Sequence, residues 1–187
     1  MENKFVISQP EWLSLEALRL RSSEKENDLI DRLYSLLTVE SLTQGLEAID
    51  PQFDVKMLSL IETSDYDSPD INKPIHLCRK VALRLSEAAV IYAESHCNPQ
   101  ASEAVSFLNC GTKSLGRRLF SQEKMLQRSD FSYAFFPLHT LPQSLRQMLR
   151  GECDSLCARR SYFTIDNQAL FITEWYLPEL VKRVVGF

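Results

Sequence analysis

The chain has 187 residues, of which 44% are hydrophobic and 25% are charged, and its formal net charge is −4. This length suits one domain, and the composition is that of a globular protein rather than of a disordered one. The negative charge argues against a broad nucleic-acid-binding face, because binding phosphates requires a basic surface.

The first residues do not form the charged and then apolar blocks of a signal peptide. No stretch approaches the roughly 18 apolar residues that a membrane-spanning helix requires. The five cysteines are an odd number without a paired framework: Cys78, Cys97, Cys110, Cys153 and Cys157. Such a set suits reduced thiols. We therefore expect a cytoplasmic protein without a membrane span.

Helical periodicity covers the first fifty residues. The clearest apolar stripe consists of leucines at helical spacing: Leu29, Leu33, Leu36 and Leu37. Thr38 or Ser41 could cap a further short helix that runs through Glu47. From Phe53 the pattern changes to the alternation of a strand. Residues 65–74 are predicted to be a polar, turn-rich connection.

The rest of the chain is rich in strands. We predict them at 75–85, 89–97, 125–136, 156–165 and 168–177, and short helices at 101–108, at 115–120 and within 137–151. Ser114 can cap the helix at 115–120, and Asp166-Asn167 suits a tight hairpin turn. Strands in runs favour an α+β fold: an antiparallel sheet of about six strands with helices packed on it, forming one domain over residues 1–187.

Two charges stand out on apolar strand faces. Arg79 shares its face with aliphatic residues only: Leu77, Val81, Leu83 and Leu85. Glu174 shares a face with Leu170, Ile172 and Tyr176. A buried charge costs several kcal/mol unless it finds a partner. The two residues could therefore form a structural ion pair, or they could border a cavity in which a ligand supplies the missing partners. The pattern alone leaves both open.

Other candidate sites are weaker. Cys153 and Cys157 could join His139 at a metal, but structural zinc motifs usually show a second close pair, so we expect no metal. His96 and Cys97 are neighbours on a strand and point to opposite faces, which argues against a nucleophilic pair. Arg159 and Arg160 could serve an anionic substrate. Alternatively, one is solvated and the other braces Glu174 or a carbonyl group.

Several segments resemble the chorismate pyruvate-lyases. Residues 111–120, GTKSLGRRLF, are similar to the "LGR.LF" stretch of that family. The ARRS of residues 158–161, followed by FITEWYLP at 171–178, resembles the closing "RRS…L.TE..LP" hairpin, with Ala158 in place of a glycine. LCRKV at 77–81 is similar to the central "LRE(I/V)" strand. ESLT at 40–43 falls where the family has "SMT".

The resemblance implies a lyase, active without a cofactor, that converts chorismate into 4-hydroxybenzoate and pyruvate as the first step toward ubiquinone. It also implies an internal site beneath helical flaps. There Arg79 would hold the ring carboxylate and Glu174 the ring hydroxyl. The main-chain groups of Leu42 and Leu115 would complete the carboxylate site. Chorismate is then the small-molecule partner, and we expect a monomer.

Two other classes of function stay open. The fold implied by the resemblance also resembles effector-binding domains of transcription regulators, so a sensor of aromatic acids without catalysis is an alternative. A relative that kept the sheet as a protein-binding module but lost turnover is another. We expect no separate DNA-reading domain before Phe53, which argues against the sensor. Arg79 and Glu174, both retained, argue against the protein-binding module.

Overall fold

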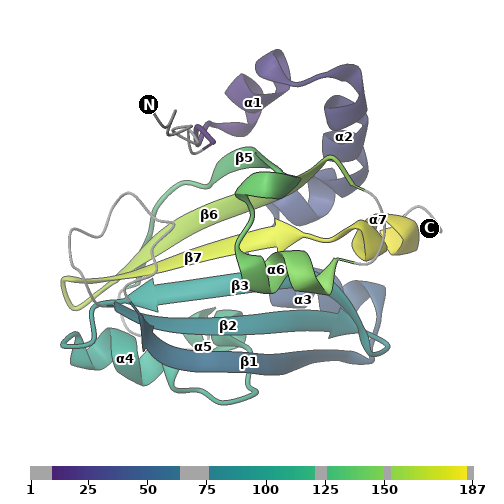
Figure 1. Cartoon of the computed structure of the whole chain (residues 1–187). Coiled ribbons are helices and arrows are strands. Elements are labelled where there is room, and N and C mark those ends of the chain that lie inside the picture. Colours follow the sequence, from purple (N-terminus) through teal and green to yellow (C-terminus); the bar gives the residue numbers. More distant parts are fainter. Residues whose placement is uncertain (1–9, 64–75, 121–125, 150–152, 185–187) are drawn as a thin grey trace, which may run out of the picture.

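The computed structural model describes residues 10–63, 76–120, 126–149 and 153–184. Its centre is an antiparallel sheet with strand order β1-β2-β3-β7-β6-β4, in which β5 also pairs with β6 (Figure 1). The strands are β1 Phe53–Thr63, β2 His76–Leu85, β3 Ala88–Cys97, β4 Gln127–Arg128, β5 Ser132–Pro137, β6 Ser155–Ile165 and β7 Gln168–Tyr176. The predicted α+β class is confirmed.

Two tight hairpins set the register of the sheet. Asp166 and Asn167 join β6 to β7 with φ values of 47° and 64°, as their tolerance of left-handed backbone predicts. Ser86 and Glu87 turn β2 into β3 with φ values of 45° and 68°. These two residue types favour such angles less. The Ser86 hydroxyl donates to the Asp50 carboxylate at 2.5 Å, which helps to hold the turn.

Helices account for the remaining described elements. They are α1 Leu15–Arg21, α2 Glu24–Thr38, α3 Leu42–Ile49, α4 Ser102–Leu108, α5 Leu115–Phe120, α6 Gln143–Met148 and α7 Pro178–Val184, with a 3-10 turn η1 at Leu138–Thr140. Ser41 is the N-cap of α3, and its hydroxyl accepts from the Gln44 N–H at 3.4 Å. Within the described ranges, no helix is both long and apolar enough to cross a bilayer.

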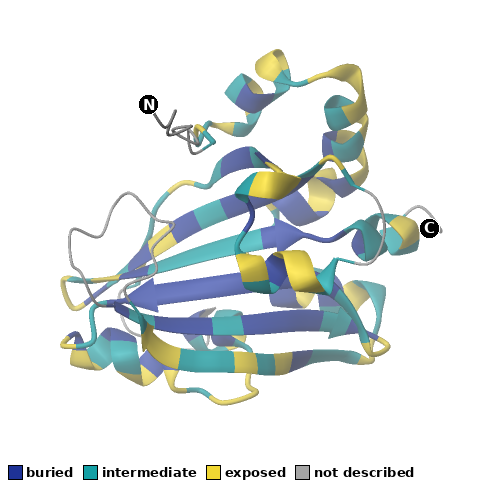
Figure 2. Ribbon diagram, viewed as in Figure 1, coloured by how far each residue is buried: buried dark blue, intermediate teal, exposed yellow. Residues whose placement is uncertain are grey.

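The sheet is covered on both faces near its middle. In Figure 1, α6 lies in front of the sheet, whereas α3 and α5 lie behind it. Residues 90–97 of β3 are all buried, while β1 at the sheet edge has exposed positions (Figure 2). A strand enclosed on both sides can hold a polar group away from water on either face. The structure has such groups on both faces of β3.

The single strand predicted at 125–136 is wrong. The described part of this region forms two strands, β4 and β5, which both pair with β6 on the same side. Between them, the Ser129 N–H donates to the Tyr162 carbonyl at 2.9 Å, and the Ser129 hydroxyl accepts from the Tyr162 N–H at 3.1 Å. Ser129 and Asp130 are turn-forming residues that interrupt the strand. The predicted connection at 65–74 lies outside the described residues.

Candidate functional site

A buried pocket lies between the sheet and the first turns of α3 and α5. Its cavity volume is about 60 Å³. It is lined by side chains of the sheet and by Leu42, Thr43, Ser114, Leu115, Gly116 and Leu119 of the covering helices. A cavity of this size holds only a few water molecules. A ring-sized ligand therefore requires its wall to move outward.

Strand register brings Arg79 and Glu174 to the same face of the sheet. Arg79 of β2 lies opposite Ser95 of β3, and Glu174 of β7 lies opposite Ala93. Cross-strand partners share a face, and Ala93 and Ser95 are two residues apart on β3. All four side chains line the pocket.

Arg79 is 2% exposed and is held by main-chain groups. Its Nη2 donates to the carbonyls of Gly111 at 2.9 Å and Lys113 at 3.1 Å. Gly111 has a φ of 59°, a left-handed angle that glycine adopts without strain. The Nε atom of Arg79 is buried without a hydrogen-bond partner in the described structure. Burial lowers the pKa of Arg79. The guanidinium thus lies at the pocket wall, and its Nε–H group has no hydrogen-bond acceptor among the described residues.

Glu174 pairs with Arg159 rather than with Arg79. Arg159 Nε lies 2.6 Å from Glu174 Oε2. The Nη1 of Arg159 also donates to three carbonyls at the end of α2 and just beyond it: those of Leu36, Leu37 and Val39. Of the two readings of Arg79 and Glu174, the direct ion pair is therefore wrong. Of the two arginines at 159–160, Arg159 is the one that braces Glu174, and it holds carbonyl groups as well. Arg160 instead lies 4.5 Å from the centre of the Trp12 ring.

Leu42 and Leu115 are the first residues of α3 and α5, and both are buried beside the pocket. The N–H groups at a helix start have no partner within the helix. The two helix starts are linked, because the Thr43 and Ser114 hydroxyls are 2.5 Å apart. The Ser114 hydroxyl also accepts from the Arg117 N–H at 3.2 Å. Both leucines therefore lie where main-chain donors can face the cavity.

Three further polar positions escaped the sequence reasoning: Arg128, Ser95 and Ser161 all line the pocket. Alternation could have indicated the two serines, since Ser95 lies two residues from Ala93 and Ser161 lies two residues from Arg159. Arg128 was missed because the prediction placed it in a single long strand at 125–136. That strand would have placed it on the face opposite Phe131, whereas both residues line the pocket.

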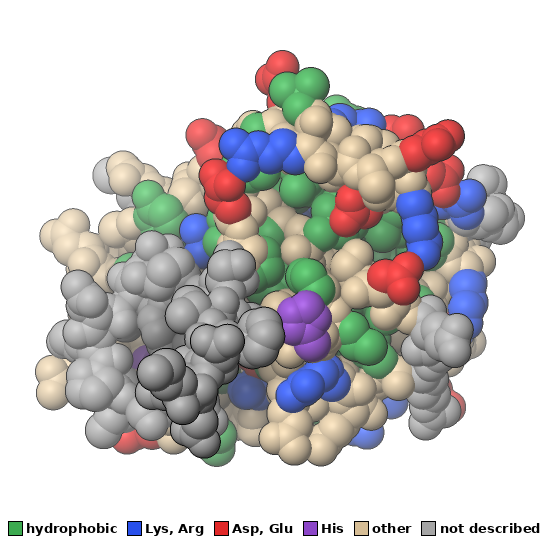
Figure 3. All heavy atoms as spheres, turned by 45° about the horizontal axis from the view of Figure 1, so that its top comes forward, with side chains coloured by type: hydrophobic (Ala, Val, Ile, Leu, Met, Phe, Trp, Pro, Cys, Tyr) green, Lys and Arg blue, Asp and Glu red, His purple; other side chains and the backbone are tan. Residues whose placement is uncertain are grey.

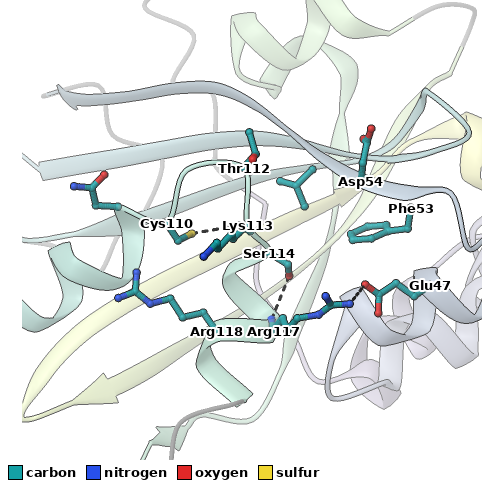
Figure 4. Close-up of a pocket in the computed structure, with 11 residues that line it drawn as sticks. Glu47, Phe53, Asp54, Cys110, Thr112, Lys113, Ser114, Arg117 and Arg118 are labelled. Atoms are coloured by element: carbon teal, nitrogen blue, oxygen red, sulfur yellow. Dashed lines mark hydrogen bonds and ion pairs between the residues drawn. The ribbon is translucent and has the colours of Figure 1, made fainter.

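A larger groove of about 1060 Å³ adjoins the buried pocket and shares Val55 and Ser114 with it (Figure 4). Its charged side chains are mixed in sign: Glu47, Asp54, Lys113, Arg117 and Arg118. Arg117 forms an ion pair with Glu47, and Arg118 donates to the Ser106 carbonyl at 2.6 Å. Acidic and basic side chains are similarly interspersed over the helical end of the molecule (Figure 3).

A second polar cluster lies on the other face of β2 and β3. Cys78, Glu94 and His96 are buried there, with His96 Nε2 at 3.2 Å from Glu94 Oε2 and 3.8 Å from Cys78 Sγ. Tyr92 and Lys80 also contact the Glu94 carboxylate, at 2.6 and 3.1 Å.

Among the described residues, this cluster is the one set of three side chains that could hold a metal, and it does not include Cys153, Cys157 or His139. The contacts of Tyr92, His96 and Lys80 already satisfy the Glu94 carboxylate. Burial raises the pKa of the Cys78 thiol to about 12, with the nearby Glu94 charge adding to the effect. Without an added ion, this thiol therefore stays protonated.

Comparison with known proteins shows which sequences and structures this chain resembles. Residues 20–186 match the family model described as "Chorismate lyase". A "Probable chorismate pyruvate-lyase" of Psychromonas ingrahamii is 31% identical over 150 residues, which cover 76% of this chain and 80% of that protein. Another, from a Shewanella species (strain ANA-3), is 31% identical over 156 residues, covering 80% and 81%.

Solved structures with a similar fold include the C-terminal domain of a histidine utilization repressor from Pseudomonas syringae pv. tomato. The TM-score is 0.50 at 11% sequence identity, covering 68% of this chain and 92% of that one. At this identity the likeness shows a shared fold and nothing of function.

Proposed function

Because the chain belongs to the chorismate lyase family, we propose that it converts chorismate into 4-hydroxybenzoate and pyruvate in the buried pocket. The observation that carries this proposal is the arrangement of Arg79 and Glu174. Both line one pocket without pairing to each other. A buried guanidinium without a carboxylate partner suits a ligand that brings its own carboxylate.

In the proposed pose, the ring carboxylate of the substrate binds Arg79 and the N–H groups of Leu42 and Leu115. The ring hydroxyl donates to Glu174. Arg159 supports this role, because its bond to Glu174 Oε2 keeps the carboxylate oriented toward the cavity. A planar guanidinium matches a carboxylate in a two-pronged contact, and a charged hydrogen bond is about twice as strong as a neutral one.

The reaction is an elimination that makes the ring aromatic. The bond between the ring carbon and the enolpyruvyl oxygen breaks, and its electron pair leaves with that oxygen. The hydrogen on the carbon that carries the hydroxyl is lost as a proton, and its electron pair completes the third double bond of the ring. The enolpyruvyl group gains a proton and becomes pyruvate. The pocket contributes by fixing one reactive conformation and by excluding water, without a covalent intermediate.

We further propose that the reaction takes place in the cytoplasm and supplies 4-hydroxybenzoate for ubiquinone. All five cysteines are free thiols, which is compatible with a reducing compartment.

Turnover of chorismate by the purified chain tests the activity. We expect equal amounts of 4-hydroxybenzoate, followed by its ultraviolet absorbance, and of pyruvate, followed by an enzymatic assay. Arg79→Gln should lose most of the activity, whereas Arg32→Gln, which removes a surface arginine paired with Asp28, should keep it. Binding of 4-hydroxybenzoate without turnover of chorismate would instead support a sensor. Neither binding nor turnover would support a protein-binding module.

A further inference from the structure

Three potential metal ligands meet on the face of β2 and β3 that points away from the buried pocket. Cys78 of β2 lies opposite His96 of β3, and Glu94 lies two residues from His96 on the same strand. Cross-strand partners share a face of the sheet, and so do residues two apart on one strand. The register of two neighbouring strands therefore brings Cys78, Glu94 and His96 together.

The three side chains are enclosed by the protein. Their residues are 0%, 3% and 6% exposed for Cys78, Glu94 and His96. One potential ligand atom from each residue lies within 4.8 Å of the other two. Water competes little for donor atoms in such a place, and a cation interacts more strongly with a carboxylate there than at the surface.

Hydrogen bonds alone do not satisfy these side chains together. His96 Nε2 lies 3.2 Å from Glu94 Oε2 and 3.8 Å from Cys78 Sγ. If Nε2 carries a proton and donates it to Glu94, it cannot accept one from the Cys78 thiol. If the thiol donates to Nε2 instead, a nitrogen lone pair and a carboxylate oxygen face each other at 3.2 Å. A cation removes this conflict, because thiolate, imidazole and carboxylate each offer it a lone pair.

The distances within the cluster suit tetrahedral coordination. Bonds from zinc to sulfur, nitrogen and oxygen are about 2.0–2.3 Å long, so donor atoms on one tetrahedral ion are roughly 3.3–3.6 Å apart. The separations of 3.2 and 3.8 Å lie on either side of this range. The fourth position can be taken by water or by His76, the next residue on this face of β2, whose ring centre lies 4.8 Å from that of His96.

The second carboxylate oxygen of Glu94 is held by other groups. The Tyr92 hydroxyl donates to Glu94 Oε1 at 2.6 Å, and Lys80 Nζ lies 3.1 Å from the same oxygen. These contacts orient the carboxylate and leave Oε2 beside His96. Outer partners that orient a ligand in this way are typical of metal sites.

The ligand types and their charges favour a divalent ion such as zinc. A thiol loses its proton to solvent when it binds a metal, so Cys78 and Glu94 supply two negative charges, which balance a divalent cation. A neutral set of this kind avoids the cost of an uncompensated buried charge. Sulfur and imidazole ligands suit zinc, whereas magnesium and calcium prefer oxygen ligands.

We propose that Cys78, Glu94 and His96 form a zinc-binding site that joins β2 to β3. The site does not depend on the proposed lyase activity, because its ligands lie on the other face of the sheet from the pocket. Cys78 directly precedes Arg79, and Glu94 directly precedes Ser95, and both of these neighbours line the pocket. A bound ion therefore fixes the two strands beneath the pocket and stabilises the folded chain.

Absorption spectroscopy with Co²⁺ on the full chain tests the site. A bond between cobalt and a thiolate gives a charge-transfer band in the near ultraviolet. Once a chelator has removed any bound metal, Co²⁺ should produce this band, and Zn²⁺, which binds such ligands more tightly, should abolish it. Cys78→Ser should lose the band, and its Zn²⁺ affinity in calorimetry should fall about a hundredfold or more. Cys97→Ser is the matched control: it removes another buried thiol, on the opposite face of β3, and should keep both.

Further variants keep the test decisive. Circular dichroism in the presence of chelator checks that each variant is folded. Tyr92→Phe removes one group that orients Glu94, so it should keep the band but bind Zn²⁺ about tenfold more weakly. If Cys78→Ser fails to fold, His96→Gln replaces it, and Zn²⁺ affinity should again fall at least about tenfold.

Two results would overturn the site. One is the absence of a band in the unmodified chain, and the other is a band or a Zn²⁺ affinity that stays unchanged when Cys78 or His96 is replaced. None of these measurements involves chorismate, so they are independent of whether the chain has the proposed activity.

Discussion

The guanidinium of Arg79 is held by two carbonyl groups, whose dipoles compensate a buried charge only in part. Glu174, by contrast, has a full counter-charge in Arg159. The two residues that face the cavity therefore differ in kind. In the proposed pose, Arg79 binds the carboxylate of the ligand and Glu174 accepts a hydrogen bond from its hydroxyl group.

Arg159 is the residue on which this arrangement depends most. Arg159→Ala would leave Glu174 without its counter-charge and remove one donor from each of three carbonyls at the end of α2 and just beyond it. Breaking a buried pair from one side costs about 3–5 kcal/mol. We expect the free energy of unfolding in urea to fall by about this amount. A loss below about 1 kcal/mol, the range of an exposed pair, would show that the pair is not buried in solution.

At the residue scale, alternation along two strands is enough to predict that Arg79 and Glu174 are buried on apolar faces. It does not predict their partners. Arg79 is bound by carbonyls of residues 111 and 113, and Arg159 reaches residues 36–39. Such contacts depend on how distant segments pack. The position of Arg128 beside the pocket depends on a strand break that a local pattern does not reveal.

Helices α3 and α5 cover one side of the pocket. Each contributes its first turn to the pocket, and the hydroxyls of Thr43 and Ser114 join them. Gly116 fits closely here, because a Cβ atom at this position would lie 3.1 Å from Thr43 Oγ1. The two helices therefore approach each other closely beside the pocket.

Ser114→Ala tests the link between the two helices. It removes both the cap of α5 and the contact with Thr43, and the loss of a cap costs about 1 kcal/mol. Ser14→Ala is a matched control, because Ser14 caps α1 far from the pocket. Both variants should lose about 1 kcal/mol of unfolding free energy, but only Ser114→Ala should bind 4-hydroxybenzoate more weakly in calorimetry. Equal ligand affinity in the two variants would contradict a role for this link.

The polar cluster between β2 and β3 makes stability depend on pH. Burial acts to raise the pKa of Glu94, but hydrogen bonds from His96 and Tyr92 and the charge of Lys80 outweigh it and lower the pKa from 4.5 to about 2. A carboxyl group whose pKa is lower in the folded state stabilises the fold above its unfolded pKa. This contribution is lost as the pH falls from 4.5 toward 2.

Glu94→Gln should therefore be less stable than the unmodified chain at pH 7, by at most about 3 kcal/mol. The difference should shrink on acidification and vanish near the folded pKa. Urea unfolding of both proteins across this pH range measures it. A difference that stays constant with pH would mean that Glu94 acts through packing rather than through its charge.

At the scale of the whole molecule, the runs of strands predict the α+β class and most element positions. The sheet order does not follow from the sequence, because β3 pairs with β7 over a long separation. The division into β4 and β5 was missed for a similar reason. Both strands pair with the same edge of β6, one after the other along its length. This arrangement is visible only in the assembled sheet.

The layered architecture also separates the two polar clusters. The cavity faces α3 and α5, whereas the Glu94 cluster lies on the opposite side of β3. Substitutions at Glu94 should therefore change the free energy of unfolding more than the ligand affinity. Substitutions at Arg79 should change the ligand affinity more than the free energy of unfolding.

A crystal structure of the chain with bound 4-hydroxybenzoate is the most direct measurement. We predict one molecule inside the buried pocket, with its carboxylate on Arg79 and its hydroxyl on Glu174, and with α3 and α5 moved outward from their closed arrangement. A ligand found only in the outer groove beside Lys113, with the buried pocket unoccupied, would contradict this placement of the active site.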